Sequence, residues 1–151
     1  MSRWRWLAPL TGFSVVIHGH SMAPTLQAGT RCWVNHWSYL LHPPARGGLV
    51  VIRSPASAAR VELKRIIGLP TETISWSSSR VQINGATLDE PYATQRPIPP
   101  GDDDMLVREL GKLEYFVAGD NRLYSQDSRS YGPVCCEMIV GKVTLPEPGR
   151  P

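Results

Sequence analysis

The apolar residues of this chain occur in short runs separated by glycine, proline, asparagine and aspartate. Short apolar or alternating runs bounded by such turn-forming residues are typical of β-strands. The pattern predicts strands at Gly12–Gly19, Arg31–Asn35, Leu49–Ile52, Val61–Gly68, Glu72–Ser77, Arg80–Ile83, Tyr115–Ala118 and Ile139–Thr144. No long stretch has helical periodicity, and the 14 prolines disfavour long helices. We therefore expect an all-β fold of mainly antiparallel sheets, barrel-like or sandwich-like, with little helix.

Three connections have recognisable turn or loop chemistry. Asn84-Gly85 predicts a tight hairpin turn, because both residue types tolerate positive φ angles. Tyr39–Leu41 predicts a short helical turn that ends at the prolines of His42–Pro44. Residues 96–104 are typical of an exposed loop. The three aspartates at its end are expected to face solvent, since calcium loops space their ligands more widely.

The length of 151 residues fits one domain, and neither an internal repeat nor a linker divides the chain. We divide it into a basic and aromatic segment at 1–13, a folded domain at 14–145 and a frayed tail at 146–151. A membrane-spanning helix needs about 20 apolar residues, and no such anchor is expected in the chain as given. The first segment has two open interpretations: a segment at the membrane surface, or an ordinary first strand that packs its aromatic residues. Its relevant side chains are Arg3, Trp4, Arg5, Trp6 and Phe13.

Charge and cysteine content exclude several classes of protein. The net charge of +3 is mild and the basic residues are scattered, so no nucleic-acid partner is expected. An odd count of three cysteines argues against a disulfide framework, and adjacent cysteines such as Cys135 and Cys136 rarely bridge each other. The Cys and His spacings match no zinc motif, and we expect neither a metal nor another cofactor.

Ser21 is the first candidate for chemistry. It follows an apolar strand, stands two residues after Gly19 and is soon followed by Pro24. Such a sequence ends a strand abruptly, exposes the serine and leaves backbone N–H groups available to a developing oxyanion. The hydroxyl still needs a base that accepts its proton. Without one, the segment is only a turn.

Lys64 is a better candidate base than any histidine. In a continuous strand His18 and His20 would face away from Ser21, and no obvious motif gives His36 or His42 an orienting carboxylate. Lys64 is the only lysine in an apolar strand-like run. Strand alternation places it on the same face as Glu62 and Ile66, with Arg65 on the other face. Burial would lower the pKa of this amine toward neutrality, which an arginine side chain does not allow. The alternative is a surface lysine whose stem covers the sheet edge.

A polar loop follows the strand that ends near Ala118. It is dense in Asp, Asn, Ser and Arg, residues that fix loops through hydrogen bonds and ion pairs. We expect Asp127 to pair with Arg129 or Arg122, and Ser125 to hydrogen-bond a nearby amine. A purely structural loop remains an alternative interpretation of this segment.

Taken together, these segments resemble the signature boxes of type I signal peptidases. The residues Ser21–Leu26 resemble the nucleophile box, Lys64–Pro70 the general-base box, and Gly119–Arg129 the closing box. Val81–Tyr92 is similar to the family hairpin that follows the lysine. The resemblance covers about residues 14–143, and it implies a β-rich serine protease that uses a Ser-Lys dyad without a metal.

The resemblance also assigns roles to individual residues. Ser21 would attack the scissile carbonyl, and Lys64 would take its proton and later protonate the leaving amine. Ser125 would hold the Lys64 amine in line. The oxyanion would bind the Ser21 N–H and a second donor, which must be a backbone group or water because Gly19 carries no side chain. Residues expected to brace the closing loop are Asp127 with Arg129 and Asp120 with Arg122.

The substrates implied by the resemblance are secreted preproteins with Ala-x-Ala-like cleavage sites, bound in extended form. Residues expected to contact the signal peptide are His20, Met22 and Pro24. The implied location is the outer face of the cell membrane. A soluble protease that trims the propeptide of one partner, as in nickel superoxide dismutase maturation, is the alternative. Two further alternatives are a self-cleaving repressor-type protease and an inactive β-module. No oligomeric state is predicted.

Overall fold

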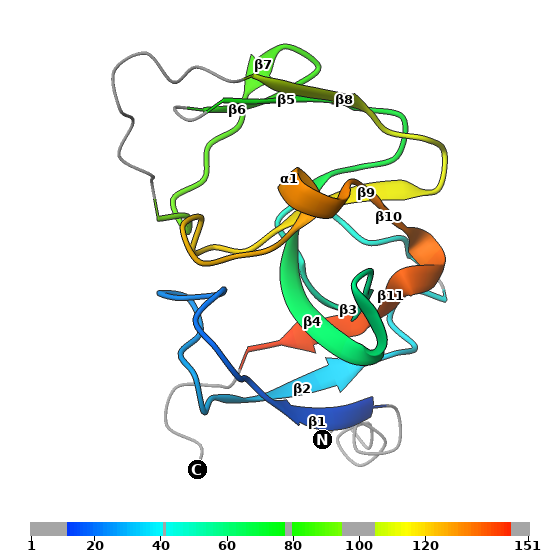
Figure 1. Ribbon diagram of the computed structural model, residues 1–151. Helices are drawn as coiled ribbons and strands as arrows, with labels where there is room; N and C mark the ends of the chain where they lie inside the picture. Colours follow the sequence, from blue (N-terminus) through cyan, green and yellow to red (C-terminus); the bar gives the residue numbers. More distant parts are fainter. Residues whose placement is uncertain (1–11, 41, 78–79, 95–104, 146–151) are drawn as a thin grey trace, which may run out of the picture.

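The computed structural model describes residues 12–40, 42–77, 80–94 and 105–145 of the chain. Within these ranges short strands dominate and the helices are single turns (Figure 1). The strands are β1 (Gly12–Val16), β2 (Arg31–Asn35), β3 (Leu49–Ser54), β4 (Ser57–Gly68), β5 (Thr73–Trp76), β6 (Val81–Ile83), β7 (Ala86–Thr87), β8 (Leu106–Glu109), β9 (Glu114–Ala118), β10 (Val134–Cys135) and β11 (Ile139–Thr144). The helices are α1 (Ser128–Tyr131) and the 3₁₀ helix η3 (Cys136–Met138). The predicted all-β fold with little helix is confirmed.

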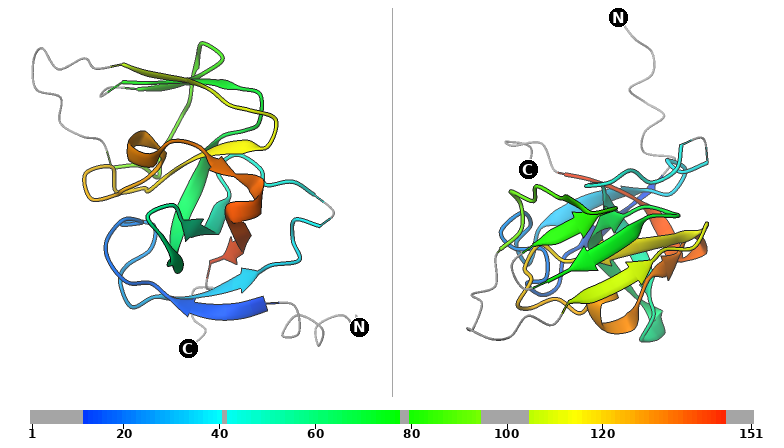
Figure 2. Two further views of the ribbon diagram at one scale, coloured as in Figure 1. Left: turned by 45° about the vertical axis from the view of Figure 1, so that its right-hand side comes forward. Right: turned by 90° about the horizontal axis from the view of Figure 1, so that it is seen from above.

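The strands form two antiparallel sheets. The larger has the order β1-β2-β11-β3-β4-β9-β10, and the smaller has the order β7-β6-β5-β8. The smaller sheet lies over one end of the larger one, as two further views show (Figure 2). β3 is buried at nearly every position because it lies inside the larger sheet with side chains packed on both faces.

Neighbouring residues of β4 connect the two sheets. Ile66 packs with Val50 and Val117 in a cluster on one face of the larger sheet. Ile67 points to the other face and packs with Ile74 and further residues of the smaller sheet. Because successive side chains of a strand alternate, β4 contributes to both clusters and holds the sheets against each other.

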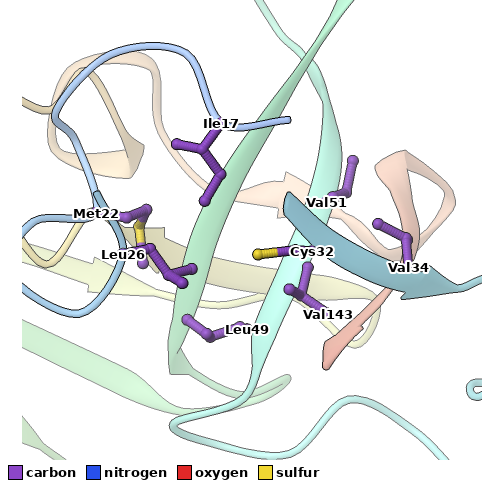
Figure 3. Packing of buried hydrophobic residues seen from close by; sticks show 8 residues of the cluster. All are labelled: Ile17, Met22, Leu26, Cys32, Val34, Leu49, Val51 and Val143. Carbon is purple, nitrogen blue, oxygen red and sulfur yellow. The ribbon is translucent and has the colours of Figure 1, made fainter. Parts of the chain in front are cut away.

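A third cluster lies beneath the segment that follows β1. It consists of Ile17, Met22, Leu26, Cys32, Val34, Leu49, Val51 and Val143, which point toward one another from five parts of the chain (Figure 3). Burying such side chains contributes about 1.5–3 kcal/mol each relative to exposure. This cluster fixes the Ser21 segment to the sheet, although the segment itself has no regular secondary structure.

The predicted hairpin turn at Asn84-Gly85 is confirmed. It joins β6 to β7, and the φ angles of the two residues are 50° and 84°. The Asn84 side chain also accepts a hydrogen bond from the Thr73 N–H at 2.9 Å, which ties the turn to β5.

The strand predicted at Gly12–Gly19 ends earlier, at Val16. Ile17 instead exchanges backbone hydrogen bonds with Thr30 and Gly29, at 2.9 and 2.8 Å. Gly19 then takes a φ of 91°, which no strand residue adopts. His18 and His20 therefore do not lie on a strand face, and the orientation expected for them was wrong.

Several elements had no clear sequence signal. β8 is mostly exposed and lies at a sheet edge, β7 and β10 have two residues each, and α1 is one turn. Cys32, Cys135 and Cys136 are free thiols, and Cys32 is buried as a small apolar side chain. The expectations for residues 1–11, 96–104 and 146–151 lie outside the described residues. No helix in the described ranges is long and apolar enough to cross a membrane.

Candidate active site

Ser21 lies in an irregular turn at the surface. Gly19, which has a positive φ, and His20 precede the serine and are exposed, and Ser21 itself is half-buried. The turn is closed by a backbone hydrogen bond of 3.1 Å from the Ala23 N–H to the His20 carbonyl. The serine is therefore accessible and held by local hydrogen bonds, as its sequence context predicts.

The neighbours of Ser21 divide into buried and exposed residues. Met22 is 1% exposed and Leu26 is 4% exposed, and both pack against Ile17 in the cluster of Figure 3. The side chain of Met22 therefore anchors the turn, and a substrate contact at this position would have to use its backbone. His20 and Pro24 are exposed beside the nucleophile, so they remain candidates for substrate contact.

The loop that follows β9 packs directly on the Ser21 turn (Figure 1). The Asn121 N–H donates to the Ser21 carbonyl oxygen at 2.9 Å. Gly119 lies between Ser21 and Ser125. A Cβ atom at Gly119 would be 2.5 Å from the Ser21 carbonyl oxygen and would collide with the Ser125 side chain. The close approach of these segments therefore requires glycine at position 119.

Lys64 extends from β4 toward Ser125, which packs beside Gly119 and the Ser21 backbone. Lys64 is 4% exposed and thus buried, whereas Lys112 and Lys142 are exposed. The Lys64 Nζ atom donates to Ser125 Oγ at 3.3 Å and lies 3.6 Å from Glu62 Oε2. The contact expected between Ser125 and an amine is confirmed, and the alternative of a surface lysine at position 64 is wrong.

Opposing effects act on the Lys64 amine. Burial lowers its pKa, and the nearby carboxylates of Glu62 and Asp127 oppose that effect, while Arg129 lowers the pKa further. The net pKa lies below the usual range of a lysine. An amine of this kind is neutral at a lower pH than a surface lysine and can then accept a proton.

Within the described residues, no hydrogen bond joins Lys64 to the Ser21 hydroxyl. The amine instead lies between Ser125 and Glu62. Ser21 and Lys64 are thus brought to one cluster through Ser125 and Gly119. Contacts of catalytic groups are often loose in the absence of a substrate.

Asp127 organises the loop on the other side of Ser125. This fully buried carboxylate accepts hydrogen bonds from the Gly119 N–H at 3.0 Å and from two Arg129 nitrogens at 2.8 and 2.9 Å. It also caps α1. Burial alone would raise the pKa of Asp127, but Arg129 and the hydrogen bonds outweigh it, so the pKa is lowered. The predicted pair with Arg129, rather than with Arg122, is confirmed.

Asp120 and Arg122 both lie in this loop but do not pair with each other. Asp120 is fully buried and accepts two hydrogen bonds from Arg65, at 2.8 and 2.6 Å, and one from Thr25. Arg122 instead pairs with Glu90 at 2.7 and 3.1 Å. The expected pair of Asp120 with Arg122 was therefore wrong, because each of them forms its ion pair with a residue from another part of the chain.

Four residues with a clear place in the site were not assigned a role from the sequence: Thr25, Glu62, Arg65 and Gly119. Only Glu62 carried a usable signal, since strand alternation puts it on the Lys64 face. The pairs made by Arg65 and Thr25 depend on long-range packing. No group of three or more His, Cys, Asp and Glu side chains in the described ranges converges as a metal site would require.

Comparison with known proteins places this site in a family context. A family model described as "Signal peptidase, peptidase S26" matches residues 8–147. The chain is 34% identical to Signal peptidase I V of Bacillus subtilis over 138 residues, which cover 85% of this chain and 81% of that protein. It is 36% identical to Signal peptidase I of Bacillus caldolyticus, with 93% and 87% of the two chains covered.

A solved structure is similar as well. The crystal structure of a signal peptidase I from Enterococcus faecalis superposes with a TM-score of 0.59 and 30% sequence identity. The match covers 67% of this chain and 97% of that chain. None of these relatives points to the maturation of nickel superoxide dismutase.

Proposed function

The chain belongs to the signal peptidase family, peptidase S26, and we propose that Ser21 and Lys64 are the residues with which it cleaves signal peptides. It is a serine endopeptidase of the signal peptidase I type, which acts on secreted preproteins. The observation that carries the assignment of the dyad is the burial of Lys64 beside Ser125, in a cluster that also contains the backbone of Ser21.

The reaction follows from the chemistry of this pair. The neutral Lys64 amine takes the proton of the Ser21 hydroxyl as its oxygen attacks the scissile carbonyl. The resulting ammonium protonates the leaving amine, and the signal peptide remains attached to Ser21 as an ester. Lys64 then takes a proton from a water molecule, which attacks the ester, and returns it to Ser21 Oγ as the ester bond breaks and the signal peptide is released.

Other residues support this reaction without taking part in bond changes. The Ser21 N–H and a second donor in the turn near Gly19 stabilise the oxyanion. Ser125 directs the Lys64 amine, and Asp127 with Arg129 fixes the backbone that carries Ser125. His20 and Pro24 contact the residues next to the cleavage site. Ala-x-Ala-like sites fit because a shallow pocket admits only small side chains.

We place the reaction at a membrane surface. β1 lies at the edge of the larger sheet and exposes Phe13 (39%) and Val16 (42%). Trp37 and Leu40, which follow the neighbouring strand β2, are also exposed, at 51% and 69%. Exposed apolar and aromatic side chains of this kind favour the boundary between water and lipid. The preceding segment, 1–13, adds the arginines and tryptophans noted in the sequence.

The test is cleavage of a preprotein with an Ala-x-Ala site by the purified full chain, with and without lipid vesicles. Ser21→Ala and Lys64→Met should each abolish cleavage at that site. Lys112→Met is the matched control, because it removes an exposed amine and should leave the rate unchanged. Vesicles should stimulate the wild-type reaction.

The outcomes separate the parts of the proposal. Retained cleavage by Lys64→Met would overturn the dyad assignment. Equal rates with and without vesicles would overturn the membrane assignment alone. A folded wild-type protein that cleaves no Ala-x-Ala site would contradict the proposed substrate preference.

A further inference from the structure

A carboxylate on the same strand faces the proposed general base. Glu62 stands two residues before Lys64 in β4, and its Oε2 atom lies 3.6 Å from the Lys64 Nζ atom. The Lys64 side chain is 4% exposed, whereas that of Glu62 is 24% exposed. The amine therefore has a charged and more exposed partner in addition to its contact with Ser125 at 3.3 Å.

We propose that Glu62 is a positioning residue, whose carboxylate holds the Lys64 amine away from Ser21 in its protonated form and sets the pH at which the site becomes active. This inference rests on the proposed Ser-Lys mechanism and adds a regulator of its base. Glu62 takes no part in bond making or breaking with the substrate, and it acts only through Lys64.

The charges around Lys64 single out Glu62 as its main counter-charge. From the loop before α1, Asp127 also faces the amine, but its charge is already taken up by two hydrogen bonds from Arg129. Glu62 forms no ion pair with an arginine in the described part of the chain. Its other contact is the Tyr131 hydroxyl, which donates to Oε2 at 3.4 Å.

Tyr131 leaves the charge of Glu62 intact. Burial, first of all, raises the pKa of this phenol, so it stays protonated and acts as a neutral donor. A neutral donor hydrogen-bonds the Glu62 carboxylate without placing an opposite charge beside it. The full negative charge therefore remains available to the Lys64 ammonium.

The charge of Glu62 affects two stages of the reaction in opposite ways. It opposes the loss of the proton that converts resting Lys64 into a base. After Ser21 attacks, the same charge stabilises the ammonium that forms. Removing the charge should therefore activate the enzyme at lower pH, but reduce the rate once Lys64 is fully neutral. A residue with only a structural role would not produce this pair of effects.

The experiment measures kcat/KM against pH for wild type and Glu62→Gln, with an Ala-x-Ala preprotein as substrate. Glutamine keeps the size and an acceptor oxygen but removes the charge. The rising limb should move to lower pH. When each profile is divided by its own plateau, the relative rate one pH unit below the wild-type midpoint should increase roughly 3- to 10-fold. The rate on the high-pH plateau should fall severalfold.

Two further variants test whether the charge itself is responsible. Glu62→Asp keeps the charge and should return the midpoint toward the wild-type value. Tyr131→Phe removes the phenol but keeps the carboxylate, so its midpoint should not move to lower pH. The matched control is Glu109→Gln, which makes the same charge change on the exposed strand β8 and should leave the profile unchanged.

A midpoint for Glu62→Gln that is unchanged or moved to higher pH would overturn the inference. The pH dependence of Ser21 labelling by a serine-directed covalent reagent gives a second readout that needs no peptide substrate, and it should shift in the same direction. If the wild type keeps its rising limb and Lys64→Met abolishes cleavage, such a negative result concerns Glu62 alone. If Lys64→Met cleaves normally, the dyad itself fails.

Discussion

Two neighbouring cations of β4 point to opposite faces of the strand and have very different surroundings. Arg65 donates to Asp120 at 2.8 and 2.6 Å and to the Gly47 carbonyl at 2.7 Å, and its guanidinium lies 3.9 Å from the centre of the Tyr92 ring. Lys64 is even less exposed, yet its contacts with Ser125 and Glu62 are longer, at 3.3 and 3.6 Å.

The difference follows from what each side chain does with its charge. A guanidinium stays protonated, so a buried arginine needs a complete set of acceptors. A buried lysine can become neutral and then needs fewer partners. β4 thus combines a permanent charge that holds three chain segments together with an adjustable charge that, in the proposed mechanism, accepts the Ser21 proton. The experiments below test that contrast, beginning with the largest expected effect.

Lys64→Met should separate activity from stability most strongly. We expect cleavage to fall by about 10³-fold or more, because no other buried amine is present in the described ranges to accept the Ser21 proton. The temperature of unfolding should stay the same or rise, since the substitution removes an amine that is costly to bury. Cleavage assays and thermal unfolding followed by circular dichroism measure the two effects. A cleavage rate within tenfold of wild type would contradict the view that Lys64 serves activity while Arg65 serves stability.

Arg65→Met should differ from Lys64→Met in that its main effect is a large loss of stability. It leaves the fully buried Asp120 without its cationic partner, which costs about 3–5 kcal/mol. Urea unfolding measures this loss. The double variant Arg65→Met with Asp120→Leu should recover much of it, because no unpaired charge remains. A stable single variant would show that Asp120 finds another partner.

The pH dependence of cleavage should follow Lys64 and not Arg65. Burial lowers the pKa of Lys64, and the base is active when neutral, so the rate should rise with pH and level off above that pKa. On the acidic side we expect about a tenfold increase per pH unit. Initial rates across mildly acidic to alkaline pH test this. A flat profile over that range would argue against a lysine base.

Gly119→Ala should disturb the cluster around Lys64 while leaving the pair of Arg65 and Asp120 in place. Its new methyl group would press on Ser125 and the Ser21 backbone, and such misplacement reduces rates by roughly 10- to 100-fold. Gly111→Ala is a useful control, because the atoms nearest to its new methyl belong to the side chain of Glu114. Equal rates for the two variants would mean that Gly119 does not set the geometry.

The smallest effect is expected for Tyr92→Leu on the Arg65 side. Loss of the aromatic ring beside the guanidinium should cost about 0.5–2 kcal/mol. The pH profile of cleavage should not move, because Tyr92 contacts the permanent charge. Urea unfolding and the pH–rate profile together test this. A shifted profile would show that the two faces of β4 are coupled.

Much of the fold could be predicted because its signals are local. Asn84-Gly85 has the φ angles that its turn needs, and the alternating run around Lys64 forms a strand with the lysine buried. Asp127 and Arg129 lie two residues apart, so a pair could be expected from the loop sequence, although Arg122 stayed open as an alternative partner until the structure decided between them.

The rest depends on contacts that no local pattern encodes. Asp120 and Arg65 are 55 residues apart, so their pair could not be inferred from the loop alone, where Arg122 was the nearest candidate. Met22 belongs to the core because it packs with Leu26 and residues of the sheet, although Ser21 and Ala23 on either side of it are only half-buried. β8 was missed because an exposed edge strand has little apolar periodicity.

One contact described above also bears on when the protein becomes active during its synthesis. Thr25 in the nucleophile turn bonds to Asp120 in the loop after β9, across 95 residues of chain. On the ribosome Ser21 is synthesised before Ser125 and Asp127. Under the proposed mechanism we expect no protease activity before those residues emerge, and the appearance of cleavage in a timed translation reaction would mark the packing of the loop after β9 onto the Ser21 turn.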